Sequence, residues 1–546
     1  MKKETRLISL ILILSLLTAI TISGCGINIK GGDSGVTHGN VNEGGTLEIG
    51  VVNKGYGDEF AYELAKAFQE KTGIKTAVTK SSSATWTEVQ MKAGAENNTL
   101  DVIFDINNIA MKNVAQKNFV AGYDCAYVDL SDIYDQPLEG YDTEKTLEEL
   151  VYPYSLRACT WGGEDMGFGN GKQYFVNWAA GIEGLVYNAS LFEKYNLSIP
   201  KTTDELFAVM KQMMSLYNGS YALNENGSKI YPFVFAGKND YTSYLTNVWW
   251  AQYDGEQSFN YVLEGKDANG VLSSNSMKAK GKLSALQIIA SILDRDAKYT
   301  DASTCLGLSF TDAQMVFLDE QAFMIPTGDW LEREMEHSYK GGADIAFMAI
   351  PVNSDVVDKC TTITTDAQLS EVISYIDGDI ETRPTYVSDE DLTFVKKARS
   401  MYCSEGNQHI AYIPAYSDNI EPAKQFIQFM LSKEGQEIML EYAYGNMAML
   451  DVDMQKFEAY ESLSSLQKSK LQLMSFEDGA TLVGRNYVYP MSYAGGAGLW
   501  YGTWANEFAA PKDSETYMTA IEYFQHEYNT NEGYWNQWVA ASGIDK

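Results

Sequence analysis

The strongest constraint on the fold is a regular alternation of strand and helix patterns that starts after about 45 residues. Strand patterns are short apolar runs, and helix patterns place apolar side chains on one face and end at a glycine such as Gly73. Strands are predicted over 46–52, 74–80 and 101–106, and helices over 58–72 and 86–95. This strand–helix order predicts a parallel sheet flanked by helices, and hence an α/β fold.

Similar units recur further along the chain. A strand pattern at 184–188 precedes a predicted helix in which Thr202 and Glu205 have capping-box spacing, and Thr311 and Gln314 repeat that spacing. Further strands are predicted at 322–330 and 345–351, and a helix with Pro422 in its first turn follows. Residues 360–400 are polar and lack clear periodicity, which predicts a surface insertion.

The N-terminus has the features of a secretory signal. Lys2, Lys3 and Arg6 precede an apolar run from Leu7 to Ile22, which is shorter than the ~20 residues that a membrane-spanning helix needs. The run ends in Ile-Ser-Gly-Cys25, a tetrapeptide that resembles the lipobox of bacterial lipoproteins. We therefore expect residues 1–24 to be a signal peptide, Cys25 to carry a lipid such as palmitate, and residues 25–45 to form a flexible tether at the bacterial cell membrane.

The rest of the chain, about 500 residues, is too long for one small core, so at least two lobes are expected. Five widely spaced cysteines remain after Cys25, with no CxxC motif, which argues against a disulfide scaffold and a zinc ribbon. One or two disulfides remain possible. The net charge of −32 argues against nucleic acid as a partner.

Seven stretches together resemble the extracellular solute-binding proteins of the maltose-binding type (family 1), which feed ABC importers. They occur in the family's order over residues 46–440, and the last hundred residues match less well. The stretches are GGTLEIGVVN, AKAFQEKTGIK, DVIFD, GLVYNASLFEKYNL, PKTTDEL, DEQAFMIPTGDW and EPAKQFIQFMLSKEGQE.

The resemblance implies a two-lobed periplasmic-binding-protein fold, type II-like, in which each lobe is a mainly parallel sheet flanked by helices and ligand binds between the lobes. It also implies that each lobe is discontinuous in sequence. Lobe one is expected to hold 46–175 and 312–405, and lobe two 176–311 and 406–546. The expected partners are a carbohydrate and an ABC-type sugar permease, and the expected oligomeric state is a monomer.

Candidate ligand-binding residues follow the predicted strands or lie in aromatic, glycine-rich stretches. Open α/β sheets bind ligands at the carboxyl ends of their strands. Trp249 and Trp250 are adjacent, so at least one of them is expected to be exposed or to line the cleft. The candidates are Asn53, Tyr56, Asp105, Asn107, Trp178, Tyr241, Trp249, Trp250, Asp329, Trp330, Arg485, Tyr493, Trp500 and Trp504.

These residue types suit a sugar, whose hydroxyls need carboxylate or amide partners and whose C–H faces stack on aromatic rings. Asp329 and Trp330 offer both functions in adjacent positions. Trp330 is predicted to stack on ligand; the alternative is packing between the lobes. A polyamine, an amino acid or peptide, and an anion remain alternative ligands.

An enzyme is not expected. The four histidines are isolated, and the chain contains no HExxH, GxSxG, Walker or GxGxxG motif. A pair of acidic residues acting on glycosides has no sequence spacing rule, so a secreted glycoside-processing enzyme is the leading enzymatic alternative. No cofactor and no metal are predicted.

Overall fold

The computed structural model describes residues 45–542 with internal gaps. The residues left undescribed are 1–44, 84, 95–98, 107–109, 115, 118, 164–167, 180, 240, 340–341, 405–408, 476–479, 485–503 and 543–546. Cys25 and the predicted tether therefore lie outside the described residues. In the described part, no helix is both long enough and apolar enough to span a bilayer.

The first sheet has five strands and contains the predicted opening of the fold. Its order is β2 (Lys75–Ser81), β1 (Thr46–Val52), β3 (Val102–Asp105), β12 (Ile410–Tyr412) and β6 (Val176–Asn177). β1 pairs in parallel with both β2 and β3, as the strand–helix alternation predicts.

Helices cover this sheet. α2 (Glu59–Thr72) buries the face that carries Phe60, Leu64 and Phe68, and it ends at Gly73, whose φ of 76° is the left-handed conformation that glycine adopts without strain. The ring of Phe68 lies 5.3 Å edge-on from that of Phe426 in α18. The other helices and the small ribbon near this sheet are α3 (Trp86–Ala93), α4 (Ala110–Val114), α5 (Ser131–Tyr134), α6 (Leu147–Leu150), α7 (Pro153–Cys159), α18 (Ile420–Leu431), α19 (Lys433–Tyr442), and β4 (Thr160–Gly163) with β5 (Phe168–Gln173).

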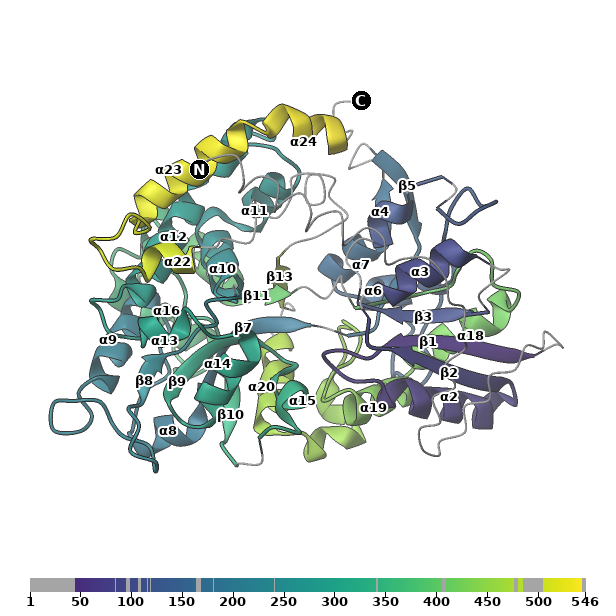
Figure 1. Cartoon of the computed structure of the whole chain (residues 1–546), viewed down its shortest axis with the longest axis horizontal. Helices are drawn as coiled ribbons and strands as arrows, with labels where there is room; N and C mark the ends of the chain where they lie inside the picture. The colour runs from purple at the N-terminus through teal and green to yellow at the C-terminus, as the bar shows by residue number, and fades with distance from the viewer. Residues whose placement is uncertain are drawn as a thin grey trace, which may run out of the picture. The chain divides into compact units, whose positions relative to one another are not determined.

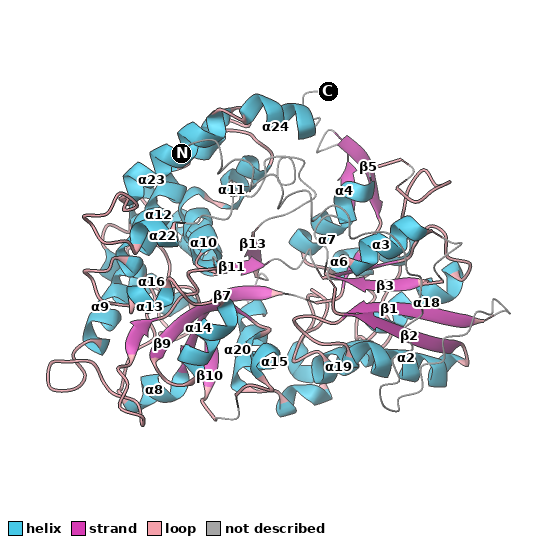
Figure 2. Cartoon of the chain, in the orientation of Figure 1, coloured by secondary structure: helices cyan, strands magenta, loops and turns pink. Residues whose placement is uncertain are grey.

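The second sheet has six strands. Its order is β13 (Thr481–Val483), β11 (Met401–Ser404), β7 (Ile182–Asn188), β9 (Ala322–Gly328) and β8 (Tyr231–Phe233), with β10 (Ile345–Met348) also paired to β7. Figures 1 and 2 show the two sheets in separate bodies, each with helices on its faces.

One strand in each sheet runs against the rest. β12 is antiparallel to β3 and β6, and β7 is antiparallel to β9, β10 and β11. Each of these two strands is the first strand in the sequence after the chain crosses from one sheet to the other. The prediction of two mainly parallel sheets is confirmed with this single reversal in each.

The strand pairing assigns segments to the two bodies differently from the predicted lobes. Residues 312–405 were expected in lobe one, but β9, β10 and β11 all pair with β7 in the second sheet. β12 was expected in lobe two and pairs with β3 in the first sheet. The lobe boundaries were implied by the resemblance alone, because an apolar strand pattern shows that a strand is buried but not which sheet it joins.

Of the two helix caps predicted in the second body, one is observed and one is displaced. Thr202 accepts a hydrogen bond from the backbone N–H of Glu205 at the start of α9 (Thr203–Met213). The capping box of α14 (Phe310–Leu318) is formed by Ser309 and Asp312 instead of Thr311 and Gln314, because the helix starts two residues earlier. Other helices here are α8 (Ala189–Lys194), α10 (Ser243–Asp254), α11 (Glu256–Leu263), α12 (Lys280–Leu293), α13 (Ala302–Cys305) and α15 (Leu331–Met335).

The polar stretch predicted as a surface insertion folds as a helical unit with its own core. α16 (Asp366–Ile376) and α17 (Asp389–Arg399) pack around buried apolar side chains that include Leu369, Val372 and Val395. Asp391 accepts hydrogen bonds from the backbone N–H groups of 361–363, which holds the preceding loop against α17.

The last part of the chain adds a third small core and a helical C-terminus. Segments near α20 (Ser465–Met474) bury methionines and aromatic rings against Ile182 and Tyr402 of the second sheet. The final helices are α22 (Ala505–Phe508), α23 (Ala520–Glu532) and α24 (Trp535–Ser542), and Figure 1 shows α23 running alongside α12.

Candidate ligand-binding site

Three aromatic side chains from both bodies meet around Trp330, and we call these four residues together the Trp330 cluster. Trp330 follows β9, Tyr244 lies in the first turn of α10, Tyr241 lies just before it, and Tyr56 follows β1 of the first sheet. The ring of Trp330 lies 6.3 Å from Tyr241, 6.4 Å from Tyr244 and 6.5 Å from Tyr56, edge-on to each. Trp330 and Tyr241 are half-buried.

The polar edge of the Trp330 indole has no partner in the described structure. Its Nε1 is buried and makes no hydrogen bond to the described residues. Because a buried N–H without an acceptor is costly, a rearrangement that brings this atom a ligand hydroxyl or a water as acceptor is favoured. The cluster therefore combines aromatic surface with an indole N–H that lacks an acceptor.

Asp329, next to Trp330, is fully engaged with protein groups. Its carboxylate accepts a hydrogen bond of 2.5 Å from the Tyr56 hydroxyl and one of 3.4 Å from the backbone N–H of Ile182, and it lies 3.2 Å from the Lys470 ammonium. Asp329, Tyr56 and Lys470 are each at most 3% exposed. Burial raises the pKa of Tyr56 and lowers that of Lys470, and the Asp329 carboxylate opposes the second effect.

Other ionisable side chains surround this group. The ring of His409 lies 4.9 Å from that of Tyr56, and burial lowers the pKa of His409 to about 4, so the imidazole is neutral at pH 7. Glu334 accepts a 2.8 Å hydrogen bond from Gln314, and burial raises the pKa of Glu334 to about 7. Glu183 in β7 is completely buried and lies close enough to raise the pKa of Tyr56.

Two predicted ligand residues lie in the core of the first body. Asp105 is 1% exposed, and its carboxylate accepts a 2.9 Å hydrogen bond from Tyr412. Trp178 is fully buried, stacks on Phe60 at 4.8 Å and donates its indole N–H to the carbonyl of Asp105. Neither side chain is accessible to a ligand in this arrangement.

The expectation that Trp249 or Trp250 is exposed is wrong. Both lie in α10, which is covered on several sides, and they are 0% and 3% exposed. Trp249 donates its indole N–H to the carbonyl of Pro351, and Trp250 donates to the carboxylate of Asp254. The prediction for Trp249 and Trp250 holds only for an extended segment. A helix buried on several faces accommodates two adjacent indoles.

The remaining described candidates lie at the sheet edge or support the cluster. Asn53 is half-buried directly after β1. Trp504 is 3% exposed and donates its indole N–H to Thr242, which lies between Tyr241 and Tyr244 in the sequence. The other candidates, Asn107, Arg485, Tyr493 and Trp500, lie outside the described residues.

Three residues that the structure brings to this region were not among the predicted candidates. Tyr244 is three positions after Tyr241, so the short spacing of the two tyrosines was the signal that could have selected them together. His409 was noted only as an isolated histidine. Lys470 lies in an ordinary amphipathic helix pattern, so no local signal marks it.

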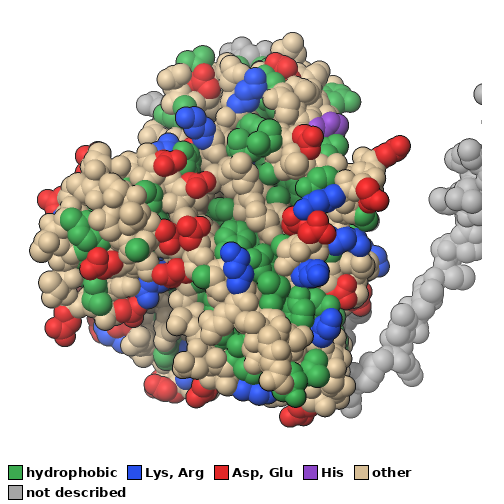
Figure 3. Space-filling view, turned by 90° about the vertical axis from the view of Figure 1, so that its left-hand side faces the viewer, with side chains coloured by type: hydrophobic (Ala, Val, Ile, Leu, Met, Phe, Trp, Pro, Cys, Tyr) green, Lys and Arg blue, Asp and Glu red, His purple; other side chains and the backbone are tan. Residues whose placement is uncertain are grey.

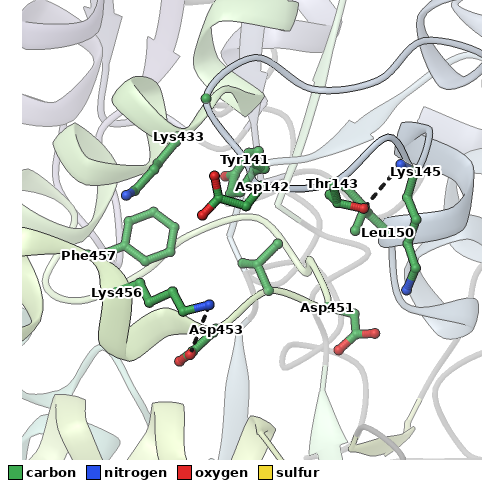
Figure 4. Close-up of a pocket in the computed structure, with 12 residues that line it drawn as sticks. Tyr141, Asp142, Thr143, Lys145, Leu150, Lys433, Asp451, Asp453, Lys456 and Phe457 are labelled. Atoms are coloured by element: carbon green, nitrogen blue, oxygen red, sulfur yellow. Dashed lines mark hydrogen bonds and ion pairs between the residues drawn. The ribbon is translucent and has the colours of Figure 1, made fainter.

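A separate cavity of about 190 Å³ shares no residue with the Trp330 cluster. Figure 4 shows its charged lining, in which Lys145, Lys433 and Lys456 are matched by three aspartates, so that no net charge selects a ligand. Phe457 is its most buried aromatic ring at 3% exposed, which leaves little surface for stacking. On the face drawn in Figure 3, acidic, basic and polar side chains are interspersed.

A family model for bacterial extracellular solute-binding proteins matches residues 63–462, which is most of the chain. The chain belongs to this family. The family and the two mainly parallel sheets agree with the resemblance seen in the sequence.

Two curated relatives match this solute-binding protein over part of its length. A multiple sugar-binding protein of Streptococcus mutans is 24% identical over 163 residues, 30% of this chain and 34% of that protein. The diacetylchitobiose-binding protein NgcE of Streptomyces coelicolor is 24% identical over 212 residues, 38% of each chain. The matched part thus spans little more than a third of each relative.

Solved structures share the fold of this solute-binding protein across nearly its whole length. RafE in complex with raffinose has a TM-score of 0.52 at 18% identity, covering 90% of this chain and 99% of that one. The solute receptor AcbH, described as selective for β-D-galactopyranose, has a TM-score of 0.55 at 12% identity, covering 90% and 98%. At these identities the likeness establishes the fold alone.

Proposed function

We propose that this solute-binding protein captures a carbohydrate, most simply an oligosaccharide, outside the cell and delivers it to an ABC-type permease by hinge closure. The observation that carries the proposal is the Trp330 cluster, in which an indole with an unbonded N–H lies among tyrosines contributed by the two bodies. Aromatic rings with a nearby hydrogen-bond donor suit the C–H faces and hydroxyls of a sugar. The names of the relatives, which refer to several sugars, support the same class of ligand.

A polyamine is the main alternative, because its sites also combine aromatic rings with carboxylates. The pairing of Asp329 and the raised pKa of Glu334 favour a neutral ligand instead. Asp329 is paired with Lys470, and Glu334 has a pKa raised to about 7, so it is largely protonated in mildly acidic conditions. Both effects weaken the negative potential that would attract a polycation.

Thermal unfolding of the purified protein against a ligand panel tests the proposal. The panel holds mono- and oligosaccharides, spermidine, amino acids, short peptides and phosphate. A ligand at 100 times its Kd adds ~2.7 kcal/mol to the unfolding free energy, which raises the Tm visibly. A selective shift with one glycan class supports the proposal, and a response confined to spermidine or peptide contradicts it.

The same glycan distinguishes binding from catalysis. We propose that the protein holds its ligand without chemical change, so prolonged incubation should return the glycan intact by chromatography. Release of shorter products at a rate proportional to protein concentration would instead identify a glycoside-processing enzyme.

We also propose that the mature protein acts as a monomer anchored to the cell membrane through lipid on Cys25, the residue that ends the lipobox-like tetrapeptide. Labelled palmitate should be incorporated into the wild-type protein and not into Cys25→Ala. The variant should move from the membrane fraction to the medium. A variant that stays with the membrane would contradict this mode of anchoring.

A further inference from the structure

A single buried hydrogen bond ties the two sheets together beside Trp330. The Tyr56 hydroxyl comes from the loop after β1, and the Asp329 carboxylate comes from the end of β9, 273 residues away in the chain. The two oxygens are 2.5 Å apart and both side chains are buried. A hydrogen bond to an ionised acceptor is stronger and more directional than a neutral one, so it fixes the orientation of the Tyr56 ring.

Lys470 in α20 makes this bond possible. A carboxylate buried to the extent of Asp329 is unfavourable without a counter-charge, and the Lys470 ammonium lies 3.2 Å away while being 1% exposed itself. The backbone N–H of Ile182 donates to the carboxylate oxygen that also faces Lys470. The other oxygen accepts from the Tyr56 hydroxyl. The three contacts of the Asp329 carboxylate therefore come from three different structural elements.

The fixed orientation of the Tyr56 ring restricts the rings that it contacts. It lies edge-on to Trp330 on one side and edge-on to the buried Trp178 on the other, at 6.5 Å and 5.9 Å. Within the described residues, it is the ring from the first body that contacts Trp330, whereas Tyr241 and Tyr244 come from the second. The position of the Trp330 indole therefore depends on where the Tyr56 ring is held.

We propose that Asp329 and Lys470 are positioning residues, which act through the Tyr56 hydroxyl to hold the Trp330 indole where a ligand contacts it. In this positioning role neither side chain touches the ligand. The role therefore differs from the ligand contact that was predicted for Asp329 from the sequence. The inference rests on the proposed function in so far as Trp330 contacts the sugar.

The first experiment removes the hydroxyl and keeps the ring. Tyr56→Phe should fold, weaken binding of the glycan found in the panel by about tenfold, and shift the ¹⁹F NMR resonance of Trp330 in protein labelled with 5-fluorotryptophan. The resonance is assigned by its loss in Trp330→Phe. The matched control is Tyr134→Phe, which also removes a buried hydroxyl, one that donates 2.8 Å to the carbonyl of Phe175 in the first body. The control should leave both readouts unchanged.

The second experiment addresses Lys470. Lys470→Met leaves Asp329 uncompensated and is expected to lower stability, so it is compared with Lys470→Arg, which restores the charge, and with Lys470→Met/Asp329→Asn, which removes both charges. The arginine variant should recover at least part of the Trp330 resonance position and of the affinity. The double variant should fold and keep an acceptor for Tyr56.

The outcomes separate the two proposals. A folded Tyr56→Phe protein with unchanged affinity and an unmoved Trp330 resonance overturns the positioning role. A shifted resonance with unchanged affinity in both Tyr56→Phe and Trp330→Ala supports positioning and shows instead that Trp330 does not contact the ligand.

Discussion

The indole of Trp330 lies directly against Gly328, two residues earlier in the chain. A Cβ atom built on Gly328 would come within 2.4 Å of the ring, closer than carbon atoms approach in folded proteins. The missing side chain at the end of β9 is therefore what allows the indole to fold back over the strand.

Gly328→Ala should displace the indole while leaving β9 paired. We expect affinity for the ligand to fall by about tenfold or more, and the Tm to fall modestly, because the new methyl group and the ring compete for one space. Calorimetric titration measures the first effect. Gly184→Ala in neighbouring β7, where a Cβ would meet its nearest atom at an ordinary 3.5 Å, is the control and should bind normally.

Trp330→Ala should weaken ligand binding by at least about tenfold without unfolding the protein. The substitution removes both the half-buried ring that would stack on the ligand and the indole N–H that would donate to it. Trp538→Ala removes another half-buried indole, which stacks on Tyr534 in the C-terminal helices. Equal loss of affinity in both variants would point to a general effect on folding, and no loss in either would remove Trp330 from the site.

Glu334 should make stability depend on pH. Burial raises its pKa in the folded protein from 4.5 to about 7, so the folded state holds a proton that the unfolded state has released. Stability from this group is present at low pH and is lost as the pH rises through that window, by up to about 3 kcal/mol.

Urea unfolding from about pH 5 to about pH 8 tests this sign, with the slope of Glu334→Gln subtracted from that of the wild type. The subtraction also removes the opposite contribution of His409, whose pKa is lowered to about 4 and which disfavours the folded state below its ordinary 6.5. A wild-type slope equal to that of Glu334→Gln would contradict the prediction.

The C-terminal helix α23 should depend on one buried ion pair. Lys282 of α12 and Glu527 of α23 lie 2.6 Å apart with side chains about one-tenth exposed. Lys282→Met should lower the unfolding free energy by about 3 kcal/mol and speed proteolysis at α23, because Glu527 is left without a counter-charge.

The double variant Lys282→Met/Glu527→Leu should recover most of that loss in the same urea assay. Lys66→Met breaks the exposed pair with Glu63 and should leave the unfolding midpoint nearly unchanged. A single variant as stable as the wild type would show that α23 is held by apolar packing alone.

Local patterns predicted the elements of the first sheet well. The strand at 46–52, the helix that ends at Gly73 and the strand around 102–105 are all observed, because each has an apolar periodicity and a clear boundary residue. The sheet to which a later strand belongs was not predictable in this way. β9 and β12 have ordinary buried-strand patterns, and only their long-range partners decide where they lie.

Only part of the candidate site could be predicted, because local patterns do not show which residues come together over long distances in the chain. Trp330, Tyr56 and Tyr241 were selected because they follow strands or lie in aromatic stretches, and the structure brings them together. Trp178, Trp249 and Trp250 carry the same residue type but fill the core. A tryptophan has no local signal that separates a packed ring from a binding surface, and a buried partner such as Lys470 is visible only in three dimensions.

The place of β12 in the first sheet also has a consequence in time. Its Tyr412 bonds to Asp105 of β3, 307 residues earlier, so this sheet stays incomplete until about three-quarters of the chain has been synthesised. A ribosome adding ≈ 5–20 residues each second needs at least about 15 s to make that stretch. During those seconds the N-terminal strands lack their closing neighbour, so the first sheet cannot complete its folding before β12 is made.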